Sequence, residues 1–181
     1  FGSIGKTSGA PITDAEYDAM CMMLSHAAST ADSLDLKLGL EPCNRYETHL
    51  LNTGKQTVQA LDRIRAENTF VHLDTYHMNI EEVSMSQGCQ DCGSRLEYIH
   101  LSESNRGVPG RGCLNWDDTF LGLKAVNFQG TMTLESFIYV DDDIAGGLAL
   151  WRPVTDSPED ILNVGIPFLI KKAKEAGINL E

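Results

Sequence analysis

The sequence predicts an α/β protein built from parallel βα units. Short apolar segments with strand character alternate with longer amphipathic segments at intervals of about 30 residues, the spacing of successive βα units. Each strand-like segment ends in, or next to, a polar residue of a kind found in active sites. The 181-residue chain is 42% hydrophobic and 22% charged, an ordinary balance for a globular protein. We therefore expect residues 1–181 to form a single domain with its own core.

The first helix and strand are visible in the N-terminal quarter. Thr13 begins a helix, since Glu16 stands where it completes a capping box. Apolar residues then recur at helical spacing as far as Ala28 and predict one buried face. Leucines alternate with other residues over 36–40 and run into Glu41. This alternation predicts a short strand that ends in a carboxylate.

A second unit follows the same plan. Thr53 can cap a helix that ends near Asn68, and its apolar residues share one face. The apolar residues at 70–74 predict a second strand, which ends in the carboxylate of Asp74. A third helix is expected over residues 80–89.

Two more strands complete the pattern. Residues 96–101 predict a third strand with His100 near its end. Helical spacing at 116–126 precedes a fourth strand, which again ends in a carboxylate, Glu135. A Ser-Pro-Glu start signal predicts a last amphipathic helix over residues 156–177.

The charge and the cysteines limit the classes of partner. Twenty-six acidic against fourteen basic residues give a net charge of −12, which would repel a nucleic-acid backbone and suits a small neutral or metal-bridged substrate. No apolar stretch approaches the roughly 18 residues that a membrane span needs. The cysteines are odd in number and scattered, which argues against a disulfide framework and favours a reducing cytoplasm. They are Cys21, Cys43, Cys89, Cys92 and Cys113.

Four polar residues at four successive strand ends predict a metal site. Side chains at the C-terminal ends of parallel strands converge on one face, where barrels and open sheets build their active sites. The four are Glu41, Asp74, His100 and Glu135. Three carboxylates and one imidazole suit manganese, magnesium or cobalt better than a thiolate-rich zinc site would. Any one of the four alone could instead be a helix cap or a structural group.

Three local motifs carry a family resemblance. They are EPCNRYE at 41–47, LDTYHMNIEE at 73–82 and HLSESNR at 100–106. These motifs resemble the D-tagatose 3-epimerase and D-psicose 3-epimerase family, within the xylose isomerase-like TIM barrels. PGRG at 109–112 and LESF at 134–137 extend the similarity.

The resemblance implies a fold, namely the C-terminal half of a (β/α)8 TIM barrel. About four βα units are expected and the N-terminal strands are missing, because a full barrel takes about 250 residues. An isolated half-barrel would expose two sheet edges and an apolar inner face. We therefore expect self-association into a homo-oligomer.

The resemblance also implies residue roles. The metal ligands are Glu41, Asp74, His100 and Glu135, of which Glu41 and Glu135 are also the acid/base pair. The groups that hold the oxygens of the sugar are Glu47, His77 and Arg106. A cation chelated by the carbonyl and the adjacent hydroxyl oxygen would stabilise an enediolate. One carboxylate could then remove a proton and the other return it on the opposite face, inverting C3 of a free ketohexose.

Several alternatives stay open at this point. The half-barrel could bind metal or assemble with itself without catalysis, or it could be a related sugar-phosphate or hydroxypyruvate isomerase. Metal-dependent nucleic-acid cleavage is disfavoured by the acidic charge. Arg106 could form an ion pair with Glu103 instead of binding substrate. His49 and His72 have no partner in the pattern and are expected to have structural or surface roles.

Overall fold

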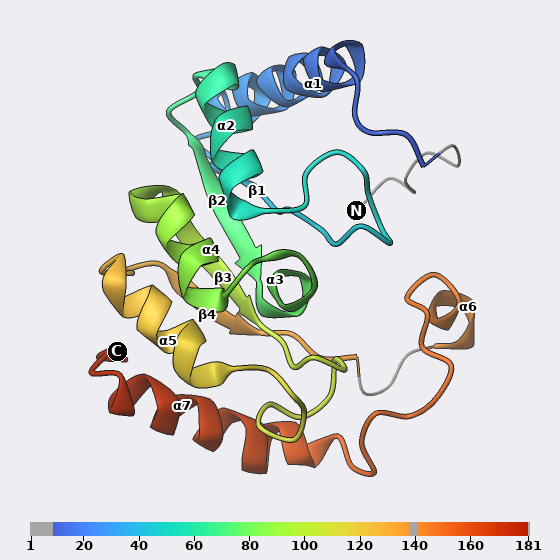
Figure 1. The fold of residues 1–181 in the computed structure, drawn as a ribbon, viewed down its shortest axis with the longest axis vertical. Helices are drawn as coiled ribbons and strands as arrows, with labels where there is room; N and C mark the ends of the chain where they lie inside the picture. The colour runs from blue at the N-terminus through green and yellow to red at the C-terminus, as the bar shows by residue number, and fades with distance from the viewer. Residues whose placement is uncertain (1–8, 138–140, 181) are drawn as a thin grey trace.

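The computed structural model describes residues 9–137 and 141–180, and its centre is one parallel β-sheet (Figure 1). The order of the strands is β1-β2-β3-β4, and each neighbouring pair is parallel. The strands are β1 (Leu38–Leu40), β2 (Thr69–Asp74), β3 (Leu96–Leu101) and β4 (Thr131–Leu134). The predicted α/β class is confirmed.

The main helices cover one side of this sheet. They are α1 (Asp14–Asp32), α2 (Gly54–Ile64), α4 (Met85–Cys92), α5 (Trp116–Ala125) and α7 (Ile166–Glu175). The short helix α3 (Thr75–Glu81) follows the end of β2 directly, and the four-residue helix α6 (Asp142–Ala145) stands apart from the sheet (Figure 1). A 3-10 turn (Gly93–Arg95) follows α4, and a π-helical segment (Ile161–Gly165) leads into α7. Figure 1 shows α2, α4, α5 and α7 following one another along the sheet, as successive βα units require. Within the described part of the chain, no helix is long and apolar enough to cross a membrane.

The helix starts predicted at Thr13 and Thr53 are confirmed, and both are capping boxes. The Thr13 hydroxyl accepts the Glu16 N–H at 3.3 Å, and the Glu16 carboxylate accepts the Thr13 N–H at 2.7 Å. Thr53 and Gln56 form the same reciprocal pair at the start of α2. Each pair satisfies two N–H groups that the first helical turn leaves without partners.

The prediction of a single helix over residues 80–89 is wrong. The chain forms α3 and α4 instead, with a break in which Glu82 is extended at ψ 150°. Asp74 caps α3 by accepting the Tyr76 N–H at 2.8 Å, and Ser84 caps α4 by accepting the Gln87 N–H at 3.1 Å. The strand-end carboxylate therefore begins a helix directly, and a second capping residue is needed to begin the next one.

The core lies between the sheet and the helices. Its deeply buried members include Val71, Leu73 and Ile99 from the strands and Leu61, Phe120 and Leu123 from the helices. Because side chains alternate along a strand, the intervening residues point to the opposite, inner face. That face carries His72 and Tyr98, whose ring centroids are 4.7 Å apart. The Tyr98 hydroxyl lies 2.6 Å from the Thr133 hydroxyl. The inner face is therefore mixed, because polar groups lie on it beside the aromatic ring of Phe70.

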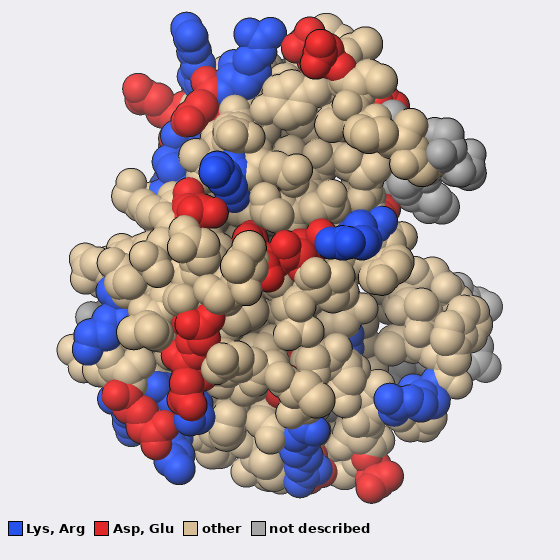
Figure 2. Space-filling view, viewed as in Figure 1, with Lys and Arg blue, Asp and Glu red and all other residues tan. Residues whose placement is uncertain are grey.

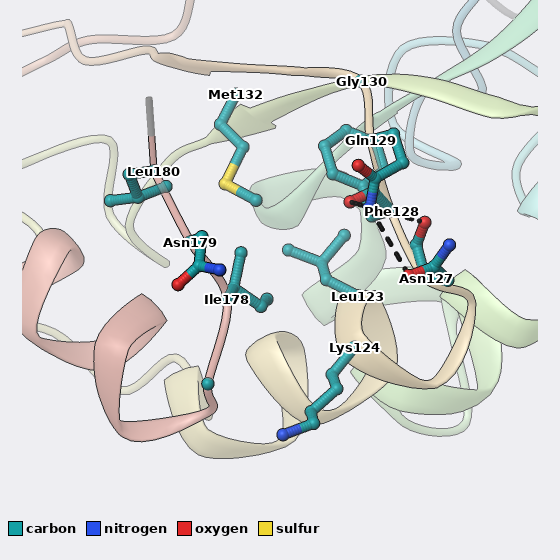
Figure 3. Close-up of a pocket in the computed structure, with 11 residues that line it drawn as sticks. Leu123, Lys124, Asn127, Phe128, Gln129, Gly130, Met132, Ile178, Asn179 and Leu180 are labelled. Carbon is teal, nitrogen blue, oxygen red and sulfur yellow. Dashed lines mark hydrogen bonds between the residues drawn. The ribbon is translucent and has the colours of Figure 1, made fainter.

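The outer strands β1 and β4 each have one edge without a strand partner among the described residues. A cavity of about 710 Å³ lies beside the start of β4. Figure 3 shows Met132 of β4 pointing towards Leu123 of α5 and Ile178 beyond α7. This cavity is at the opposite end of β4 from Glu135. Its lining mixes apolar and polar side chains, and it is not part of the strand-end cluster.

Candidate metal centre and substrate site

The structure brings the four strand-end side chains together. His100 Nδ1 lies 3.8 Å from Glu41 Oε1, 3.9 Å from Asp74 Oδ2 and 3.5 Å from Glu135 Oε2. Parallel register accounts for this convergence, since Asp74 pairs with His100 across β2 and β3. Asp74 and His100 belong to the two central strands. Glu41 and Glu135 follow the two outer strands and stand on either side of them.

The donor set fits a hard divalent cation. Ligand atoms of Asp74, His100 and Glu135 lie within 4.8 Å of one another, and Glu41 belongs to two overlapping groups of the same kind. The buried Nδ1 of His100 has no hydrogen-bond partner within the described residues. A buried imidazole nitrogen without a hydrogen-bond partner, surrounded by carboxylate oxygens, is suited to coordinate a cation. The assignment of all four as ligands stays a prediction.

Arg106 occupies the centre of this cluster. Its Nη1 donates to Asp74 Oδ2 and to Glu135 Oε2, both at 2.5 Å. The guanidinium also lies over the Tyr76 ring, 4.0 Å from its centroid. The alternative ion pair with Glu103 is not formed: the Glu103 carboxylate accepts backbone and indole N–H groups instead.

The backbone at Arg106 is held in an unusual conformation. Its φ of 60° lies in the left-handed region, which costs a non-glycine residue of order 1–3 kcal/mol. The Arg106 carbonyl compensates by accepting the Ser136 hydroxyl at 2.6 Å and the Phe137 N–H at 2.9 Å. These bonds link the loop after β3 to the segment after β4. The turn directs the guanidinium into the cluster.

His77 and Glu47 lie at the border of the same cluster. His77 Nε2 is 4.0 Å from Asp74 Oδ2 and 3.3 Å from Arg106 Nη2. Its Nδ1 accepts the Asn44 backbone N–H at 3.1 Å, and the Asn44 amide donates to Glu47 Oε1 at 2.9 Å. His77 is buried, while the Glu47 side chain is 45% exposed. The seven predicted site residues therefore form one connected group.

Burial and charge set the protonation of the cluster. Burial raises the pKa of Glu41, an effect that His100 partly offsets. Burial would also raise the pKa of Glu135, but His100 and Arg106 hold that pKa well below its usual range. Burial alone would lower the pKa of His100, yet the neighbouring carboxylates raise it. The two outer carboxylates thus differ in basicity because their surroundings differ.

Sequence reasoning missed His72 as a neighbour of the site. Its Nε2 is buried without a hydrogen-bond partner in the described part of the chain and lies 3.9 Å from Glu41 Oε1. The signal was present, because His72 precedes Asp74 by two residues in a strand and therefore shares its face. Burial, and then His100, lower the pKa of His72 to about 4. It is a neutral ring at the floor of the cluster.

Comparison with known proteins places this arrangement in a family. The family model described as "Xylose isomerase-like TIM barrel" matches residues 3–169. The chain is 35% identical over 171 residues to an L-ribulose 3-epimerase of Methylomonas sp., covering 93% of this chain and 59% of that protein. It is 38% identical over 141 residues to a D-psicose 3-epimerase of Enterocloster bolteae, covering 77% of this chain and 47% of that protein.

A solved structure agrees with the sequence relatives. The D-allulose 3-epimerase from Methylomonas sp. superposes with a TM-score of 0.86 at 32% identity, over 94% of this chain and 59% of that chain. The present chain thus spans less than two thirds of the length of these relatives, and its four βα units correspond to part of a barrel. On the combined match of family model, sequence and fold, the chain belongs to the xylose isomerase-like TIM barrel family.

Proposed function

We propose that this chain carries the catalytic part of a divalent-metal-dependent ketose 3-epimerase that inverts C3 of a free ketohexose. One observation carries the proposal: Glu41 and Glu135 follow the two outer strands and flank Asp74 and His100. Inversion at a carbon requires one group on each face of the substrate, and carboxylates on two sides of one site meet that requirement. The epimerases among the relatives support the reaction class.

The cation would be held by Glu41, Asp74, His100 and Glu135. Three carboxylates with one imidazole favour Mn²⁺, with Mg²⁺ or Co²⁺ as alternatives. When bound, the cation supplies Lewis-acid stabilisation of negative charge beside the reacting carbon. Arg106 at present bridges Asp74 and Glu135, so we expect its guanidinium to move towards the substrate oxygens when a cation binds.

The protein side chains would supply proton transfer and substrate binding. One of Glu41 and Glu135 removes the proton at C3, leaving an enediolate, and the other delivers a proton to the opposite face. Arg106 and His77 are donors for sugar oxygens, and Glu47 is an acceptor for a hydroxyl. Arg106 contacts Asp74, His77 lies next to Arg106, and Glu47 lies 3.9 Å from His77 Nδ1.

A small, unphosphorylated sugar suits the charges around the site. Figure 2 shows Lys and Arg interspersed with Asp and Glu on the visible face, with no continuous basic area on it. Arg45, close to the site in sequence, is paired with Glu81 at 2.9 Å. These features favour a neutral sugar over a sugar phosphate or a nucleic acid. None of the five cysteines forms a disulfide, which supports a reducing, cytoplasmic location.

A direct assay tests this function. The purified chain, stripped of metal with a chelator, is incubated with D-fructose or D-tagatose, with and without Mn²⁺, and the products are separated by chromatography. Mn²⁺-dependent formation of the 3-epimer is expected. If Mn²⁺ binds and no epimer forms, the chain is a non-catalytic metal-binding half-barrel. If neither is observed, the four residues are not a metal site and the proposal fails.

A further inference from the structure

We propose that Asn44 is a positioning residue that fixes the tautomer of His77, so that His77 presents an Nε2–H donor to the site. The hydrogen bonds between Asn44 and His77 do not depend on the proposed function. Only the effect of the tautomer on catalysis rests on the proposed function. Asn44 is 1% exposed and His77 is 4% exposed, so solvent cannot replace the contacts between them.

Two donors converge on one nitrogen. The Asn44 backbone N–H points at His77 Nδ1 from 3.1 Å, and Asn44 Nδ2 lies 2.9 Å from the same atom. A backbone N–H is always a donor, so His77 Nδ1 must offer its lone pair. An imidazole that accepts at Nδ1 and is neutral carries its only proton on Nε2.

The orientation of the Asn44 amide is determined by its other partners. Its Oδ1 accepts the Tyr46 backbone N–H at 2.9 Å, which identifies that atom as the oxygen. The remaining atom, Nδ2, donates to Glu47 Oε1 at 2.9 Å. The two possible assignments of the amide are therefore distinguished by a fixed backbone donor. Asn44 thus positions Glu47 and His77 together.

The consequence for the site is specific. His77 Nε2–H faces Arg106 Nη2, another donor, across 3.3 Å. Two donors facing each other call for an acceptor, such as a carbonyl or ionised oxygen of the substrate, to be shared between them. The same tautomer leaves no lone pair at Nε2 for a cation or a proton. His77 is therefore a donor, and the cation belongs to the group of Asp74, His100 and Glu135 rather than to the overlapping group that contains His77.

Nitrogen-15 NMR of the full chain tests the tautomer directly. Long-range ¹H–¹⁵N spectra at neutral pH report which imidazole nitrogen is protonated, and a His77→Gln sample identifies the His77 signals. We expect protonated Nε2 and bare Nδ1 in the unaltered protein. A protonated Nδ1 there would overturn the proposal without any variant being needed.

The Asn44→Asp variant isolates the amide donor. Aspartate keeps an oxygen for the Tyr46 N–H but replaces Nδ2 with a second acceptor facing His77 Nδ1. We expect a proton to appear on Nδ1 in this variant, while the backbone amide spectrum shows the fold retained. An unchanged His77 pattern would show that the backbone N–H of residue 44 suffices, and would overturn the role of the Asn44 amide. If the variant does not fold, the spectrum of the unaltered protein still decides the tautomer.

A double-variant comparison connects the tautomer to turnover. In the active enzyme, Asn44→Asp should lower kcat/KM by roughly tenfold to a hundredfold, the effect of losing one buried hydrogen bond to substrate. In a His77→Gln background the same change should have a smaller effect, because glutamine has no tautomers and only the lost contact of Asn44 with Glu47 remains. Additive losses would overturn the coupling. An inactive chain with the expected spectra would reject the epimerase function and leave the tautomer assignment standing.

Discussion

The imidazole of His72 meets the imidazole of His100 edge to face, with ring centroids 4.3 Å apart and planes at 89°. His100 is the one nitrogen ligand that we predict for the cation, and His72 also lies 3.9 Å from the Glu41 carboxylate. His72 therefore supports two of the four predicted ligands from the inner face of the sheet. Groups behind a metal site orient its ligands and influence cation affinity.

Replacing His72 should weaken cation binding. His72→Phe keeps a ring against Tyr98 and His100 but removes the nitrogen that faces Glu41. We expect Mn²⁺ affinity, measured by isothermal titration calorimetry, to fall by roughly tenfold to a hundredfold. The control is His26→Phe on the exposed face of α1, which should bind Mn²⁺ normally. Unchanged affinity in His72→Phe would make His72 purely structural.

Asp74→Asn should separate folding from cation binding. Asparagine can still cap α3 by accepting the Tyr76 N–H, and Arg106 keeps Glu135 as an ion-pair partner, so the metal-free protein should still fold, with a melting temperature lowered by loss of the Arg106–Asp74 pair. Mn²⁺ at 100 times its Kd should stabilise the unaltered chain by about 2.7 kcal/mol, whereas the variant should gain little. Thermal melts with and without Mn²⁺ measure the stability of the metal-free protein and the stabilisation by the cation.

The matched control for that experiment is Asp118→Asn. Asp118 also accepts a helix N–H, that of Ser86 at 3.0 Å, but it lies outside the strand-end cluster. Its variant should keep the full response to Mn²⁺. A full response in Asp74→Asn as well would exclude Asp74 from the ligand set.

Glu135→Gln should abolish proton exchange at the reacting carbon. The variant keeps the shape of the side chain but cannot accept or deliver a proton at working pH. Deuterium uptake at C3 of the sugar in D₂O should fall by at least about 10². Glu97→Gln, at the start of β3 and paired with Lys37, should exchange normally. Undiminished exchange would remove Glu135 from the acid/base pair.

Glu103 should make stability depend on acid pH. Burial would raise its pKa, but hydrogen bonds from the Ser104 N–H, the Trp116 indole and the N–H groups of Gly110 and Leu114 outweigh it and lower the pKa. A carboxyl with a depressed folded-state pKa contributes stability above its unfolded pKa of about 4.3, and loses it as pH falls through the folded value. Urea unfolding at a series of pH values should show this loss below about pH 4.3.

Glu103→Gln assigns that loss to one residue. At neutral pH the variant should be less stable by about 2 kcal/mol, because charge-assisted hydrogen bonds become neutral or mismatched. The difference should shrink at acid pH, since the native carboxylate is then protonated too. A difference that is constant with pH would mean that packing, and not the charge of Glu103, is responsible.

The open edges of β1 and β4 should promote self-association. Sedimentation velocity should show concentration-dependent association at micromolar protein, because the outer edges of β1 and β4 have no strand partner within the described residues and Met132 lines an open cavity beside β4. Met132→Lys should weaken association, whereas Met22→Lys on the exposed surface of α1 should not. A stable monomer for the unaltered chain would contradict the expectation.

The features predicted correctly depend on neighbours in the sequence. The capping boxes at Thr13 and Thr53 involve residues three apart, and the strand ends at Asp74 and Glu135 follow from local hydrophobic patterns. The break between α3 and α4 was missed because two strong capping residues, Asp74 and Ser84, compete with a continuous helical pattern. Propensity alone does not resolve that competition.

The sequence by itself determined that four strand-end residues share one face, because parallel βα units align the ends of their strands. Only the tertiary structure decided the pairings within that face. Arg106 bridges Asp74 and Glu135 because its left-handed backbone and the contact with Ser136 direct it inward, and His77 is oriented by Asn44 from a different loop. These contacts join segments far apart in the chain, and their geometry depends on how the loops pack, which no local pattern encodes.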